Sequence, residues 1–133
     1  MDKLFSLFKK KELLVAGLIS GTSADGIDTC LVKIKEVRDG LKIKLLGFKT
    51  YEYADSIRQK IFELYKDKNH DLDDLVRLSM FLGKSFAQAV IDLCKKLGIN
   101  KNRLDLIGSH GQTIRHLPKV ANFCGEKTRG TLQ

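Results

Sequence analysis

A segment rich in glycine, hydroxyl and carboxylate side chains follows the first apolar run and has the composition of a phosphate-binding loop. It consists of Gly21, Thr22, Ser23, Ala24, Asp25, Gly26, Ile27 and Asp28. Its two glycines permit tight, positive-φ geometry in which successive amides converge on phosphate oxygens, and the two hydroxyls add donors. Asp25 could hold a Mg²⁺ ion through water. The same composition is typical of an ordinary hairpin loop, so composition alone leaves both interpretations open.

A second polar group follows a short apolar strand that is predicted at residues 104–108. It contains Ser109, His110, Gly111, Gln112 and Thr113. Ligands of open α/β sheets bind at the carboxyl ends of strands, where these residues are expected. His110 could donate to a sugar oxygen or carry a proton, and the Gln112 amide could bind a hydroxyl or carbonyl group. A lone histidine is often structural, so both roles of His110 stay open, whereas Arg58, Arg115 and His116 are expected on the surface.

Three strands are expected to position the glycine-rich segment. Residues 13–19 form a continuous apolar run, which is typical of a mid-sheet strand buried on both faces. Residues 27–37 and 41–53 come closer to alternation of apolar and polar side chains, as in strands with one exposed face. The link Asp39-Gly40 predicts a two-residue hairpin turn with positive φ at both positions. The chain is therefore expected to open with three antiparallel strands.

Two helices and a further strand are expected after these strands. Asp55 or Ser56 can cap a helix that ends near residue 66, and a polar break at residues 67–69 precedes a longer helix over residues 71–97. Gly98 is placed to stop that helix. The strand at residues 104–108 is expected to lie parallel to the first strand. Beyond Pro118 the pattern weakens, and residues 130–133 have the character of a new strand.

Length and charge limit the protein to a few classes. A chain of 133 residues, 43% of them hydrophobic, fits one α/β domain with a moderate core. The net charge of +8 is scattered, so no nucleic-acid partner is predicted. The apolar runs are too short for a membrane helix, so no membrane partner is predicted either. Three widely separated cysteines favour a reduced, cytoplasmic protein.

Three blocks of the sequence resemble a known enzyme family. Residues 17–28 read GLISGTSADGID, residues 107–116 read IGSHGQTIRH, and the chain ends in TLQ. The order of these blocks and their amino-acid sequences resemble those of the anhydro-N-acetylmuramic acid kinases. The stretch at residues 120–128 departs from the family pattern because it lengthens the approach to TLQ. The resemblance covers the chain from about residue 13 onward, and family members are much longer.

The resemblance implies a fold, a reaction and site residues. The implied fold is actin-like, with two ribonuclease-H-like domains and ATP between them. The implied reaction opens the 1,6-anhydro ring of the amino sugar with water and passes the γ-phosphoryl group of ATP to O6. By motif, residues 21–28 would bind ATP with Mg²⁺ at Asp25, and residues 109–113 would face the sugar. The catalytic residue is expected downstream of residue 133, and full-length members could form homodimers.

These inferences lead to one expected organisation and three hypotheses. Residues 1–12 are expected to be an N-terminal extension, and residues 13–133 an incomplete, N-terminal part of the kinase domain. The leading hypothesis is a kinase fragment that is inactive alone. A second hypothesis is a non-catalytic remnant or interaction module that pairs with another chain. A third is a basic nucleic-acid binder, which rests on the net charge of +8 alone.

Overall fold

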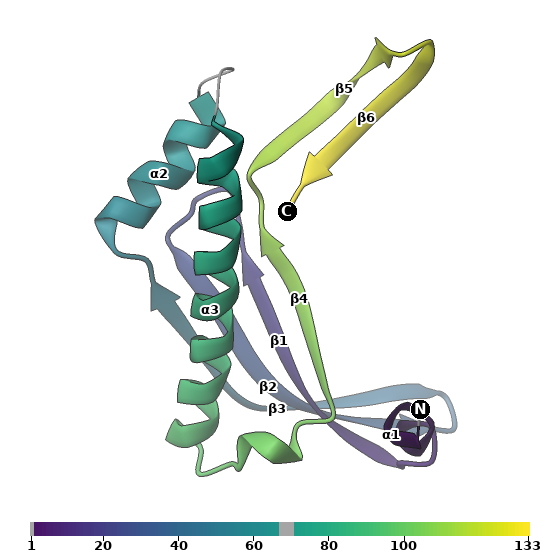
Figure 1. Ribbon diagram of the computed structural model, residues 1–133. Helices are drawn as coiled ribbons and strands as arrows, with labels where there is room; N and C mark the ends of the chain where they lie inside the picture. Colours follow the sequence, from purple (N-terminus) through teal and green to yellow (C-terminus); the bar gives the residue numbers. More distant parts are fainter. Residues whose placement is uncertain (1, 67–70) are drawn as a thin grey trace.

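The computed structural model describes residues 2–66 and 71–133, which form three α-helices, one short 3₁₀ helix and six strands (Figure 1). In chain order these are α1 (Asp2–Leu7), β1 (Glu12–Ser20), β2 (Gly26–Val37), β3 (Gly40–Glu52), α2 (Asp55–Lys66), α3 (Leu72–Lys96), η1 (Lys101–Arg103), β4 (Leu106–Gln112), β5 (Arg115–Phe123) and β6 (Glu126–Leu132). The chain is thus a mixed α/β protein, as its sequence predicts.

Four strands form a mixed sheet in the order β3-β2-β1-β4. β1 pairs antiparallel with β2, and β2 pairs antiparallel with β3. β4 lies parallel to β1, as expected for a strand that returns after a helix. The predicted central position of the first strand is therefore confirmed. The carboxyl ends of β1 and β4 meet at one edge of the sheet, where both polar segments of the sequence lie.

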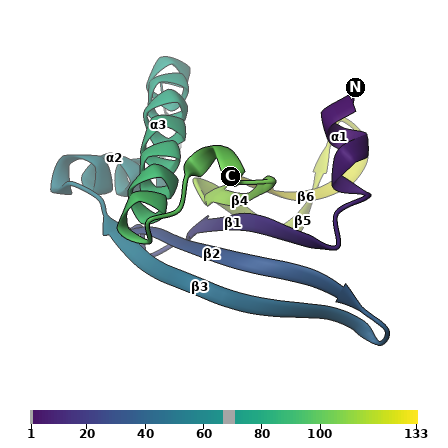
Figure 2. The ribbon, with the colours of Figure 1, turned by 90° about the horizontal axis from the view of Figure 1, so that it is seen from below.

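The helices cover one face of the sheet only. Figure 2 shows α2 and α3 on the same side of the strands. Ala16 and Leu18 of β1 and Leu31 of β2 face them and are buried, whereas Ile19 of β1 is 44% exposed. The prediction that β1 is buried on both faces is wrong, because no described helix packs against the second face of the sheet.

The long helix α3 follows its sequence signals closely. The Asp71 side chain accepts a hydrogen bond from the Asp73 amide and caps the first turn, and Gly98 ends the helix at φ +65°. Leu82, Phe86 and other apolar side chains of one face pack into the core. The predicted helix boundaries are confirmed, as are those of α2, whereas the predicted break at residues 67–69 lies outside the described residues. No described helix, α3 included, is long and apolar enough to cross a membrane.

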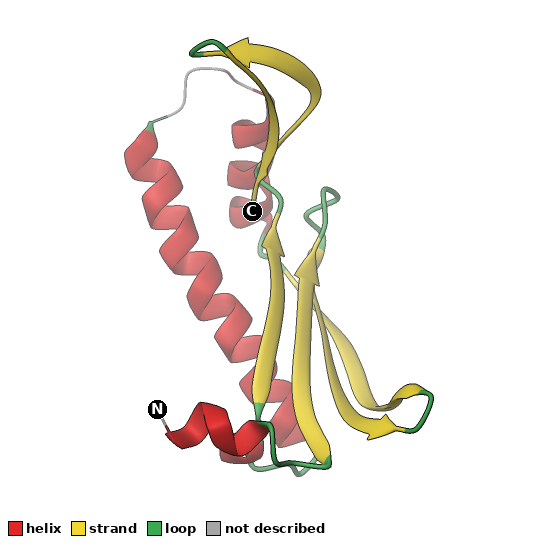
Figure 3. Cartoon of the chain, turned by 90° about the vertical axis from the view of Figure 1, so that its right-hand side faces the viewer, coloured by secondary structure: helices red, strands yellow, loops and turns green. Residues whose placement is uncertain are grey.

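Two loop predictions need correction. The turn between β2 and β3 is formed by Arg38 and Asp39, one residue earlier than predicted, because Gly40 already pairs with Val37. Only Gly40 has positive φ there, at +132°. Where the sequence predicted weak structure, β5 and β6 form a separate antiparallel hairpin that projects from the end of β4 (Figure 3). Cys124 and Gly125 make its turn, with φ +53° and +88°.

Pro118 explains why β5 escapes prediction. A proline lacks the amide that a strand ladder needs, so it normally argues against a strand. Here the ladder with β6 is interrupted between Leu117 and Ala121, and Pro118 lies within that interruption.

Near the amino-terminal end of the chain, Lys10 forms an ion pair with Asp105, the residue before β4. The predicted domain boundary at residue 12 stays a prediction.

Candidate functional site

The segment between β1 and β2 is a tight hairpin loop. The Ala24 amide donates to the Gly21 carbonyl over 3.2 Å, and Ala24 has a positive φ of +49°. The Ala24 side chain is fully buried, so the loop is anchored on the core at this residue. On the far side of the loop, the Tyr53 amide donates to the Asp25 carbonyl over 3.2 Å and ties the loop to the end of β3.

The glycines of this loop have a different role from the one that the sequence predicted. Neither Gly21 nor Gly26 has positive φ, since the left-handed position is taken by Ala24. A Cβ atom at Gly26 would lie 2.4 Å from the Tyr51 carbonyl oxygen of β3. Gly26 is therefore required by the close approach of two strands, and Gly21 has open space around it.

The exposed tip of the loop carries hydrogen-bond donors that the protein does not use. Thr22 and Ser23 are exposed. Within the described part of the chain, neither residue hydrogen-bonds through its amide or its hydroxyl. Four donors on two adjacent residues can thus converge on one anionic group, and this set suits the oxygens of a phosphate. The nucleotide-phosphate role that composition alone left open stays a prediction.

Asp25 is the carboxylate of the loop that can face a ligand. Its Oδ1 accepts from Arg58 Nη2 of α2 over 2.9 Å, and its side chain is 62% exposed. Asp28, further along β2, accepts from the Thr50 hydroxyl over 2.5 Å. Among the residues that the structure describes, no three His, Cys, Asp or Glu side chains gather as a metal site. A single exposed carboxylate fits a Mg²⁺ ion that keeps most of its water, not a cage of protein ligands.

Gln112 joins this loop to the end of β4 and is almost completely buried, at 2% exposure. Its Oε1 accepts from the Ser20 hydroxyl over 2.6 Å. Its Nε2 donates to the Gly21 carbonyl over 2.9 Å, and to the Tyr65 hydroxyl and the Thr113 carbonyl over 3.1 Å each. The amide predicted to bind substrate is therefore engaged with protein, and it fixes the start of the loop.

Tyr65 of α2 completes this network, and sequence reasoning missed it. Its hydroxyl donates to the Thr113 carbonyl while accepting from Gln112. Burial raises the pKa of the Tyr65 phenol, against the opposing effect of the Gln112 hydrogen bond, so the phenol stays a donor at neutral pH. A tyrosine in the last turn of an amphipathic helix carries no sequence signal of such a role. Ser20 was equally missed; its single hydroxyl hydrogen is shared between Gln112 Oε1 and the Gly26 carbonyl, each 2.6 Å away.

The other predicted sugar-facing residues lie on different sides of β4. Ser109 is on the side of α3, beside Leu18 in the ladder, and accepts from the Gly111 amide over 3.1 Å. His110 is the next strand residue, so it points to the opposite face, where its Nε2 lies 2.8 Å from Gln133 Nε2. Thr113 is buried at the junction of β4 and β5. The structure brings only Gln112 and Thr113 into contact with the residues around the loop.

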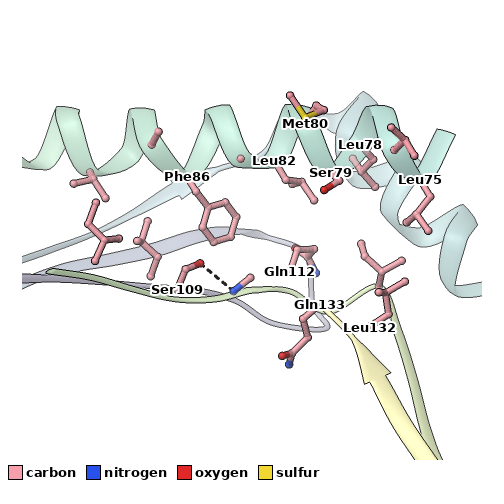
Figure 4. Close-up of a pocket in the computed structure, with 18 residues that line it drawn as sticks. Leu75, Leu78, Ser79, Met80, Leu82, Phe86, Ser109, Gln112, Leu132 and Gln133 are labelled. Carbon is pink, nitrogen blue, oxygen red and sulfur yellow. Dashed lines mark hydrogen bonds between the residues drawn. The ribbon is translucent and has the colours of Figure 1, made fainter. Parts of the chain in front are cut away.

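The described residues form at least two hollows that border the end of β4. The larger has a volume of about 720 Å³ and lies between α3 and β4. Figure 4 shows Leu78, Leu82 and Phe86 pointing from α3 into it, opposite Ser109 and Gln112. The smaller, of about 420 Å³, lies beside the loop and is lined mainly by polar residues of the loop, α2 and β5. The first is an apolar groove, and only the second has the chemistry of a polar ligand site.

Comparison with known proteins identifies the family. The sequence profile described as anhydro-N-acetylmuramic acid kinase matches residues 13–129. A protein of that name from Caldanaerobacter subterraneus subsp. tengcongensis is 44% identical over the whole chain, which covers 34% of that relative. One from Bacillus cereus is 43% identical over 91% of the chain and 31% of the relative. The chain thus spans about a third of the length of these relatives, and it belongs to the anhydro-N-acetylmuramic acid kinase family.

Proposed function

We propose that this chain forms the phosphate-binding part of an ATP-dependent kinase that acts on 1,6-anhydro-N-acetylmuramic acid. The observation that carries the proposal is the set of unused amide and hydroxyl donors at Thr22 and Ser23. They lie at the tip of a hairpin whose base is fixed by Gln112. The relatives' names supply the substrate. Family membership also favours a kinase over a non-catalytic interaction module.

The proposed fold is the ribonuclease-H-like layer of an actin-like kinase. Support comes from the strand order β3-β2-β1-β4, with three antiparallel strands followed by a parallel one. In such a layer the first hairpin loop and the end of the fourth strand face the same cleft. Both polar segments of this sequence lie at that edge. The proposed compartment is the cytoplasm, where ATP is available.

The proposed reaction couples hydrolysis of the anhydro ring to phosphoryl transfer. Water forms a bond to C1 as the bond between C1 and O6 breaks. O6 forms a bond to the γ-phosphorus as the bond from that phosphorus to the β–γ bridging oxygen breaks. The products are N-acetylmuramic acid 6-phosphate, ADP and the proton released from water. Such a reaction asks a protein chiefly to position the groups and to neutralise phosphate charge.

The chain's own residues would supply the positioning. The amides and hydroxyls of Thr22 and Ser23 would donate to phosphate oxygens. Asp25 would hold Mg²⁺ through water, and the ion would neutralise charge on the nucleotide phosphates. Residues 109–113 would contribute to the sugar side of the cleft, with Gln112 acting through the loop. The groups that activate water are proposed to lie in the part of the relatives that this chain does not cover, so the chain alone should turn over negligibly.

Amide NMR titration of the 133-residue chain with a non-hydrolysable Mg·ATP analogue tests the proposal. The amide signals of Thr22, Ser23 and Asp25 should shift, and AMP at the same ionic strength should not shift them. Ser23→Ala should weaken binding a few-fold, whereas Ser85→Ala, whose hydroxyl bonds only to the Phe81 carbonyl within α3, should leave it unchanged. Unshifted loop signals at millimolar analogue would refute the phosphate role. Rapid phosphorylation of the sugar by this chain alone would refute its proposed incompleteness.

A further inference from the structure

The smaller hollow has features that the proposed phosphate role does not use. It is bordered by Thr22 of the loop, Tyr65 of α2, the buried pair Thr113 and Ile114, and the first residues of β5. Its volume of about 420 Å³ is within the range of small-molecule sites. Because Thr22 belongs to both the loop and this hollow, a molecule bound here lies next to the donors proposed for the phosphate.

Arg115 gives the hollow a positive charge held in a fixed place. Its Nη1 donates to the Tyr65 carbonyl at the end of α2 over 2.9 Å. Among the described residues, no carboxylate lies within ion-pair distance of its guanidinium. One of its five N–H donors is thus used for orientation, and the others can form the planar fork that binds a carboxylate with two hydrogen bonds.

His116, the next residue of β5, also borders the hollow, and strand alternation turns its side chain away from that of Arg115. Its Nδ1 lies 2.7 Å from the Thr131 hydroxyl of β6, which fixes the ring against the β5–β6 hairpin. Among the described residues, none that lines the hollow is an Asp or a Glu. The Arg115 guanidinium and the Thr22 hydroxyl, with no acid among the described residues of the lining, favour an anion over a cation or an apolar group.

The larger groove offers no comparable recognition. Apolar side chains line most of it, among them leucine, phenylalanine and valine residues of α3, and its few polar groups include the buried Gln112, whose amide is already engaged. A charged group placed in that groove would lose its hydration without gaining a counter-charge. The two hollows therefore differ in kind, and only the one at Arg115 suits an acidic ligand.

We propose that the hollow beside the phosphate loop binds the carboxylate of the acidic sugar, with Arg115 as the carboxylate-binding residue. The inference rests on the proposed function, because the kinases of this family are named for an acid. It places the acceptor sugar against Thr22, where phosphoryl transfer requires the acceptor and the terminal phosphate to be neighbours. It also makes this chain discriminate between the acid and a neutral anhydro sugar of similar size.

Parallel NMR titrations of the 133-residue chain with three ligands test the inference. These are 1,6-anhydro-N-acetylmuramic acid, 1,6-anhydro-N-acetylglucosamine, which lacks the carboxylate, and the Mg·ATP analogue. The acid should shift the Arg115 Nε–Hε signal and the Thr22 amide, and should bind at least about tenfold more tightly than the neutral sugar, a factor within the range for a charged hydrogen bond. If the nucleotide analogue shifts the Arg115 Nε–Hε signal and the acid does not, the hollow binds phosphate and the inference is overturned.

Variants give a second, independent readout. Arg115→Gln should remove the preference for the acid and leave the weak affinity for the neutral sugar, and Arg115→Lys should restore part of the preference. Arg103→Gln changes an exposed arginine of η1 and should change neither affinity. Equal affinity of the wild-type chain for the two sugars would overturn the inference without any variant. The response of the Ser23 and Asp25 amides to nucleotide reports the proposed function separately.

Discussion

The hydrogen-bond network around Gln112 should be a main determinant of the stability of the loop. Its buried carboxamide contacts Ser20, Gly21, Tyr65 and Thr113. The Nε2 atom has only two hydrogens for three acceptors, so the network amounts to about three hydrogen bonds, each contributing about 1 kcal/mol. Gln112→Met keeps the length of the side chain and removes its polar atoms. We expect this change to lower the free energy of unfolding by about 3 kcal/mol.

Urea denaturation followed by far-ultraviolet circular dichroism measures this loss. With a urea dependence of about 1–3 kcal/mol per molar, the midpoint should fall by about 1–3 M. The control is Gln88→Met, which removes an exposed hydrogen bond to Asp92 on α3 and should cost less than about 0.5 kcal/mol. If the two variants are equally stable, the Gln112 network does not hold the loop and our reasoning is refuted.

The variant Gln112→Glu adds a test with a defined pH dependence. Its second oxygen would replace a donor and face the carbonyls of Gly21 and Thr113, so burial and these acceptors should raise the pKa of the new carboxyl group. A raised folded-state pKa means that stability is greatest below the unfolded pKa of about 4.3 and is lost as the pH rises through the folded value. The stability gap to the wild type should therefore widen from pH 4 to pH 8.

Three further predictions concern the residues around the site. Gly26→Ala places a Cβ atom against the backbone of β3 and should lower stability by about 1–3 kcal/mol in urea titrations, whereas Gly108→Ala enters open space and should not. Tyr65→Phe should cost about 1–2 kcal/mol in the same assay and should broaden the Gly21 amide signal, and unchanged values would contradict the network. The hydrogen bond from Lys10 and a backbone amide lower the pKa of Asp105, so its contribution is present above the unfolded pKa and lost as the pH falls through the folded one. The difference in stability between the wild type and Asp105→Asn should therefore become smaller as the pH is lowered from 7 to 3. A difference in thermal melts that stays constant over this range would disprove the prediction.

The local sequence signals predicted most of the secondary structure. Three local signals each specified one feature of the secondary structure. The apolar run at residues 13–19 specified β1, and the cap at Asp71 and the stop at Gly98 specified the two ends of α3. The parallel direction of β4 relative to β1 was also predicted, because a strand that returns after a helix lies parallel to the first, and the structure adds that the two strands are neighbours. Local signals failed at Pro118, because the register shift that accommodates a proline is a property of two paired strands.

The residue types in the sequence predicted the candidate site, and the structure corrected where several of its side chains lie. The sequence located the loop at residues 21–28 and the polar end of β4, but it attributed the tight turn to glycine, whereas Ala24 takes the positive φ. It also grouped His110 with Gln112, which strand alternation and a shift in the ladder place in different surroundings. The positions of side chains around a site depend on strand register and on neighbouring elements, and a sequence motif specifies neither of them.

The sequence by itself determined the family, the order of the elements from β1 to β4, and the two segments that meet at one edge of the sheet. The tertiary structure alone decided that Gln112 is a buried anchor, that Tyr65 belongs to the site, and that Arg115 lines a hollow beside Thr22. The physical reason is distance along the chain: Gly21 and Gln112 are 91 residues apart, and only the folded sheet brings their polar groups within hydrogen-bond reach.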